Sequence, residues 1–159
     1  MPARLALRHA MSNLAHEHYI RGLELEEADR RAARFAYESC LAGDCSHLEA
    51  RINLGRLLHL EGLHADAERI YSDTQEADAT LFFNLAVLME DLGRDEDAVK
   101  FYREAIVHDP GMADAHLNLS ILLERRGHVQ NAFRHLLAYH RLLQAQKDPA
   151  DFAHVPEEG

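Results

Sequence analysis

The sequence predicts an all-helical fold in which about four antiparallel helix pairs stack into a solenoid. Two observations support this prediction. A short motif recurs three times along the chain, and a glycine follows each copy at the same distance. Only 8 glycines and 4 prolines occur among 159 residues, which leaves room for long helices joined by few turns.

Each copy of the motif reads apolar–Asn–Leu–small–x–Leu–apolar, and the copies begin at Ile52, Phe83 and Leu117. The third and seventh positions of the motif lie four residues apart, on one face of a helix. Glycines then stand where each helix must end, and alanines follow five residues later, where two helices would touch. These residues are Gly62, Gly93 and Gly127, followed by Ala67, Ala98 and Ala132. One pair cannot bury its apolar face alone, so the pairs are expected to stack.

The spacing of 34 residues from Gly93 to Gly127 is the period of the tetratricopeptide repeat (TPR). Residues 79–112 resemble this family best, and they match its pattern at Phe82, Leu85, Ala86, Met89, Gly93, Ala98, Tyr102, Ala105 and Pro110. The chain is similar to the TPR proteins of bacteria. The resemblance implies a right-handed superhelix of four TPR-like repeats at about 14–47, 48–78, 79–112 and 113–147. An N-terminal capping helix or arm (1–13) and a flexible C-terminal tail (148–159) would flank them.

The resemblance also implies a function: a non-enzymatic scaffold or adaptor that binds an extended or helical peptide segment of a partner protein. The first helix of each pair would line a concave groove. The residues expected there are Ile52, Asn53, Arg56, Phe83, Asn84, Val87, Asp91, Leu117, Asn118, Ile121, Glu124 and Arg125. Its three asparagines would bracket peptide groups, because a carboxamide both donates and accepts. Alternatively, the asparagines only tie neighbouring helices together.

The groove composition predicts the chemistry of the partner. Its apolar floor would be formed by Ile52, Phe83, Val87, Leu117 and Ile121, and exposed apolar area of this kind usually marks an interaction site. The alternative is that residues 5–14 fold back and cover it. Acidic residues outnumber Arg56 and Arg125 near the groove, so we expect a partner that is neutral to basic and partly apolar.

Composition argues against several other classes of function. The net charge is -10 and no run of Lys or Arg exceeds two residues, so we expect no direct contact with nucleic acid. No stretch approaches the ~20 apolar residues that span a bilayer, and the N-terminus lacks a signal-peptide core. The two cysteines, Cys40 and Cys45, cannot form a disulfide scaffold, which favours a cytoplasmic protein with reduced thiols.

We expect neither a metal nor a cofactor. The twelve histidines include His16-Glu17-His18, which is not the His-Glu-x-x-His of zinc proteases. We expect the histidines at the surface, with His116 solvated at a helix end or loop. Cys40 takes a helix-packing position and should be buried, whereas Cys45 falls in a turn. Phosphate-binding glycine motifs and nucleophile motifs are also missing from the sequence, so an enzyme is not expected.

The last predicted helix, 129–144, carries more apolar residues than one face can use. A solenoid end needs a polar cap, so this helix predicts a homodimer or another contact through the terminal helix. The alternative function is a regulatory or sensor TPR module that acts with a DNA-binding regulator or by self-association. A third reading, an enzyme with its site in the groove, would require a bound metal or a hydrolase activity that depends on His16 or His18.

Overall fold

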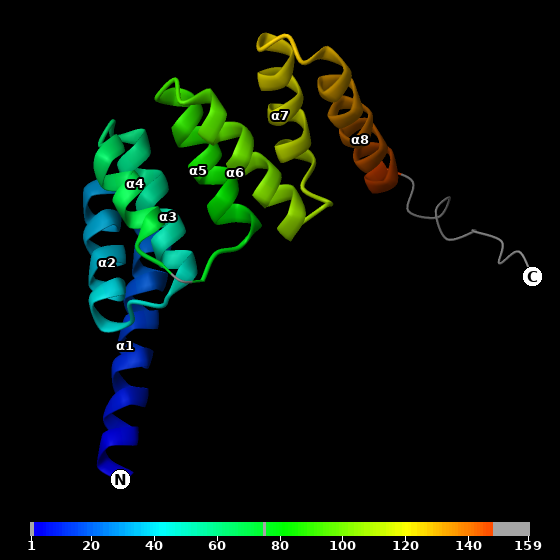
Figure 1. Ribbon diagram of the computed structural model, residues 1–159. Coiled ribbons are helices and arrows are strands. Elements are labelled where there is room, and N and C mark those ends of the chain that lie inside the picture. The colour runs from blue at the N-terminus through cyan, green and yellow to red at the C-terminus, as the bar shows by residue number, and fades with distance from the viewer. Residues whose placement is uncertain (1, 75, 148–159) are drawn as a thin grey trace, which may run out of the picture. The chain divides into compact units, whose positions relative to one another are not determined.

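The computed structural model describes residues 2–74 and 76–147, with side chains from residue 10 onward. These residues contain eight α-helices and no strand (Figure 1). The chain divides into two compact units, of which the first ends at Ala77 and the second begins at Asp78. The predicted tail, 148–159, lies outside the described residues.

Unit 1 contains α1 (Pro2–Leu25), α2 (Arg30–Gly43), α3 (Leu48–Leu60) and α4 (His64–Ser72). Each helix packs on the next one along the chain. Helix α1 runs without a break through the boundary expected between residues 13 and 14. A capping role for residues 1–13 remains a prediction.

Unit 2 contains α5 (Ala79–Asp91), α6 (Asp95–His108), α7 (Ala113–Arg125) and α8 (Val129–Lys147). The same packing order recurs, with α5 on α6, α6 on α7 and α7 on α8. Each unit therefore consists of two helix pairs, as the repeat motif predicts. None of the helices in the described part of the chain combines the length and the apolar character needed to cross a membrane.

The predicted turn glycines end three of the helices. Gly62, Gly93 and Gly127 have φ values of 77°, 69° and 79°, in the left-handed region that favours glycine. The amide of Arg94, next after Gly93, donates back to the carbonyl of Met89 at 2.8 Å, as in a Schellman cap. Helix starts are fixed by side chains as well, since Asp78 accepts a hydrogen bond from the amide of Leu81 at 2.8 Å.

Small residues allow the helices of a pair to approach closely, as predicted. Ala67 and Ala98 are fully buried, and Ala132 is nearly so. A Cβ added at Gly55 of α3 would lie 2.3 Å from Cε1 of Tyr71 on α4. The backbone of α3 therefore lies directly against the tyrosine ring, and only glycine fits.

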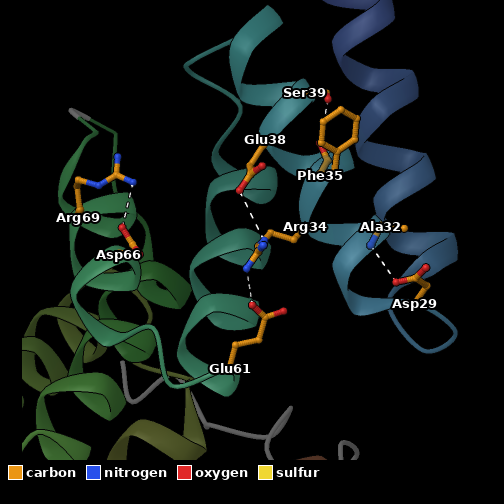
Figure 2. A network of polar contacts seen from close by, with 9 residues as sticks. All are labelled: Asp29, Ala32, Arg34, Phe35, Glu38, Ser39, Glu61, Asp66 and Arg69. Atoms are coloured by element: carbon orange, nitrogen blue, oxygen red, sulfur yellow. Dashed lines mark hydrogen bonds and ion pairs between the residues drawn. The ribbon is translucent and has the colours of Figure 1, made fainter.

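Ion pairs on the surface of unit 1 brace the helices further. Figure 2 shows Arg34 of α2 between two glutamates. Its Nη1 lies 2.6 Å from Oε2 of Glu61 at the end of α3, and its Nε lies 3.8 Å from Oε1 of Glu38 on its own helix. Because these side chains are partly exposed, each pair contributes about 1 kcal/mol or less.

We expect Gly55→Ala to lower the free energy of unfolding of unit 1 by about 1–3 kcal/mol, although alanine is the better helix former. The new methyl group would overlap the Tyr71 ring. Urea unfolding followed by circular dichroism measures the change, with exposed Asn131→Ala on α8 as the control. An unchanged or raised stability of Gly55→Ala would contradict the packing described for α3 and α4.

Candidate functional site

Unit 2 contains a small hollow formed by residues of α5, α6 and α7. Its volume is about 140 Å³, and it is lined by Val87, Glu90, Asp91, Tyr102, Asn118 and Ile121. Four of these residues, Val87, Asp91, Asn118 and Ile121, belong to the predicted groove set. We call this hollow the unit 2 recess.

A hydrogen-bond network centred on Tyr102 forms the polar wall of the recess. The Tyr102 hydroxyl donates to Oε2 of Glu90 at 3.0 Å, and Nδ2 of Asn118 donates to the hydroxyl oxygen at 3.3 Å. Burial, and then the negative charge of Glu90, raise the pKa of Tyr102. The hydroxyl therefore stays protonated and holds Glu90 and Asn118 in place.

Arg125 completes the wall from the solvent side. Its Nη1 lies 3.2 Å from Oε1 of Glu90, and its Nη2 lies 3.1 Å from Oδ1 of Asp95. The guanidinium is thus shared between two carboxylates, and Asp91 adds a further carboxylate to the lining. Acidic groups outnumber the single arginine here, in agreement with the charge that the sequence analysis expects.

Unit 1 carries a similar network around Tyr37. The Tyr37 hydroxyl donates to Oε1 of Glu26 at 2.5 Å, and Nδ2 of Asn53 lies 3.4 Å from the hydroxyl oxygen. The guanidinium of Arg56 donates to the other oxygen of Glu26. Asn53 and Arg56 are therefore brought together through Glu26 and Tyr37, which are not part of the predicted groove set.

The remaining groove residues do not share one environment. Ile52 is buried, with 8% of its surface exposed. It therefore belongs to the core and does not form part of an open apolar floor. Asn84 donates to the carbonyl of Thr80 in its own helix at 3.0 Å, unlike the other two asparagines. The ring of Phe83 packs edge-on against the ring of Tyr102, with 5.8 Å between the ring centroids. Leu117 is half-buried and Glu124 is exposed.

A constant spacing in the sequence could have identified the two tyrosines as partners of the asparagines. Each precedes its asparagine by 16 residues, Tyr37 before Asn53 and Tyr102 before Asn118.

The burial of Arg51, in contrast, was not predicted by any pattern in the sequence. Arg51 is 4% exposed and donates to the carbonyls of Cys45 at 2.6 Å and Ile70 at 2.9 Å. It borders a hollow of about 490 Å³ with Ser46 and Thr74, and its contacts tie the loop before α3 to the end of α4.

Comparisons with known proteins identify the repeat. No protein-family model matches the chain. It is 30% identical over 110 residues to the TPR repeat-containing thioredoxin TTL4 of Arabidopsis thaliana. That alignment covers 67% of this chain and spans only 16% of the relative's length.

Solved structures show the same fold. The chain resembles MamA (residues 41 to the end) of Desulfovibrio magneticus RS-1, with a TM-score of 0.71, 19% identity, and coverage of 83% of this chain and 77% of that one. It also resembles YrrB, described as a TPR protein with an unusual peptide-binding site, with a TM-score of 0.67, 16% identity, and coverage of 83% and 68%. The chain is a TPR protein.

The histidines of this TPR protein include one close pair, in which His116 is buried and His135 is half-buried. Nδ1 of His116 on α7 lies 3.1 Å from Nδ1 of His135 on α8, and His116 is only 8% exposed. The expectation of a solvated His116 is therefore wrong, because the residue falls on the face of α7 that packs against α8. Among the described residues, no group of three or more His, Cys, Asp or Glu side chains is arranged to hold a metal ion.

The cysteines behave as the sequence analysis expects. Both are unpaired, with Cys40 buried and Cys45 exposed. Burial raises the pKa of the Cys40 thiol to about 11, so this thiol is protonated and packs as a small apolar group.

We expect the stability of unit 2 to fall as the pH is lowered through about 6.5. Burial, then His116 and Arg103, lower the pKa of His135 below its ordinary 6.5. The unfolded chain therefore takes up a proton at His135 at a higher pH than the folded chain does. Above that range both states are neutral at this residue, so it adds no pH dependence there.

The measurement is urea unfolding at about pH 7.5 and about pH 5.5, for the wild type and for His135→Gln. Glutamine keeps a hydrogen-bonding group but does not titrate. The variant should lose less stability between the two pH values than the wild type. An equal loss in both proteins would show that His135 does not carry the effect.

Proposed function

We propose that the chain is a non-enzymatic interaction scaffold that binds a peptide segment of a partner protein on the surface of α5 and α7 that contains the unit 2 recess. The unit 2 recess carries this proposal, because it combines apolar contacts with hydrogen-bonding groups in one hollow. Val87 and Ile121 supply the apolar contacts, and Asn118 and Glu90 supply the polar ones. Peptide sites commonly join these two kinds of contact.

The fold supports the same proposal. TPR solenoids serve as protein-binding scaffolds, and the similar YrrB structure is described as having a peptide-binding site. Asn118 donates one amide hydrogen to Tyr102, which leaves its carbonyl oxygen and a second hydrogen to contact a peptide group. Asn53 has the same capacity in unit 1. These asparagines thus brace the helices and can still contact a partner.

The acidic character of the surface refines the proposed partner. With a net charge of -10, the chain favours a neutral to basic, partly apolar segment and disfavours direct contact with nucleic acid. A cytoplasmic location, favoured by the two unpaired cysteines, belongs to the same proposal. None of the contacts among the described residues favours the regulatory alternative.

A selection of random 12-residue peptides displayed on phage tests the proposal. We expect peptides selected on the wild type to bind Ile121→Ser at least about 10-fold more weakly, because the exposed isoleucine side chain is lost from the recess. The matched control is Val107→Ser, which removes another exposed aliphatic side chain of unit 2, on α6. Equal affinity of both variants and the wild type for the selected peptides would reject this face as the binding surface.

Self-association through α8 is a separate part of the proposal. Val129, Phe133 and Leu137 follow one another at intervals of four residues and are all exposed, so they form one apolar stripe. We expect a concentration-dependent dimer in analytical ultracentrifugation that Phe133→Ser weakens and Val107→Ser does not. A wild type that sediments as a monomer at high concentration would contradict this expectation.

A further inference from the structure

The two tyrosine networks occupy equivalent places in the two units. In each, a tyrosine of a second helix donates to a glutamate 11 or 12 residues before it. In each, an asparagine 16 residues after the tyrosine donates to the hydroxyl. The sequence around the glutamates matches as well, since an acidic residue follows each one: Glu27 after Glu26, and Asp91 after Glu90.

The networks differ at the residue three positions after the asparagine. In unit 1 this residue is Arg56, whose guanidinium binds the glutamate. In unit 2 it is Ile121, which is 51% exposed and has no charged group that could pair with the glutamate. Unit 1 thus shows where a guanidinium lies when it meets this set of groups. In unit 2, the corresponding residues Glu90, Tyr102, Asn118 and Ile121 line the recess.

The lone pairs of Glu90 leave room for a second cation. Arg125 comes from the next turn of α7, and its guanidinium donates a hydrogen bond to Asp95 and forms an ion pair with Glu90. A carboxylate accepts at about four lone-pair sites, so Glu90 can accept more than the two contacts described. Asp91 lines the same hollow, and its negative charge is among the causes that raise the pKa of Tyr102.

We propose that the unit 2 recess binds an arginine side chain of the partner peptide, with its guanidinium against Glu90 and Asp91. The aliphatic part of that side chain lies along Val87 and Ile121, as long basic side chains do on apolar surface. A guanidinium suits the site better than an ammonium, because its planar fork donates several hydrogen bonds in fixed directions. This inference rests on the proposed function and names the side chain that the site selects.

Two capped pentapeptides test the proposal: acetyl-Ala-Leu-Arg-Leu-Ala-amide, and the same peptide with citrulline in place of arginine. Citrulline keeps the shape of arginine but has no charge. In NMR titrations of the full chain, the arginine peptide should shift the Asn118 side-chain amide signals. It should also bind about 10-fold more tightly than the citrulline peptide, since charge-assisted hydrogen bonds are the stronger ones. Added salt should reduce that difference.

Two variants provide the internal comparison. Ile121→Arg places a guanidinium where unit 1 has Arg56, so it should fill the recess and abolish binding of the arginine peptide. Val107→Arg adds the same guanidinium at an exposed position of α6 outside the recess, and it should retain the preference for arginine over citrulline. The lysine version of the peptide should bind more weakly than the arginine version.

The outcomes separate this inference from the proposed function. If the arginine and citrulline peptides shift the Asn118 signals with equal affinity, the site takes peptides without reading the guanidinium, and the inference fails alone. Equal or tighter binding of the lysine peptide, or undiminished binding to Ile121→Arg, also overturns it. If neither pentapeptide shifts these signals, the arginine site is rejected, while the phage selection independently decides whether the face binds peptides.

Discussion

The contact of a tyrosine ring with a glycine of the neighbouring helix determines much of the packing in unit 1. An added Cβ at Gly22 or Gly55 would lie 2.4 or 2.3 Å from the ring of Tyr37 or Tyr71. In this way a large aromatic side chain becomes fully buried between two helices. For Tyr37, the buried ring also carries the hydroxyl to the place where Glu26 and Asn53 meet it. In unit 1, helix packing and the polar network therefore have one common origin.

The fold followed from the sequence because its determinants are local and repeated. Gly62, Gly93 and Gly127 have the backbone conformation that their spacing predicts, and the alanines five residues later are buried. The TPR assignment was correct for the same reason. Ile52 and His116 were misjudged because helical phase alone does not say how closely neighbouring elements cover a position, and both residues are only 8% exposed.

The candidate site was only partly predictable. Val87, Asp91, Asn118 and Ile121 were expected to face the partner, and they line one hollow. Glu90 and Tyr102 complete it through side-chain hydrogen bonds that depend on three-dimensional distance. Asn84 shares the motif with Asn53 and Asn118 but bonds to its own helix, so an identical sequence position does not guarantee an identical partner. The roles of these residues in binding remain predictions.

Arg56 has a consequence for how many partners one chain can hold. Because it is tethered to the same polypeptide, its guanidinium is present at Glu26 at an effective concentration that a free peptide cannot match. The position of Arg56 in unit 1 is therefore self-occupied, whereas unit 2 has Ile121 there, so under the arginine proposal the described residues offer a single anchoring point. A single anchor implies short residence times, so durable attachment would depend on several chains being displayed together.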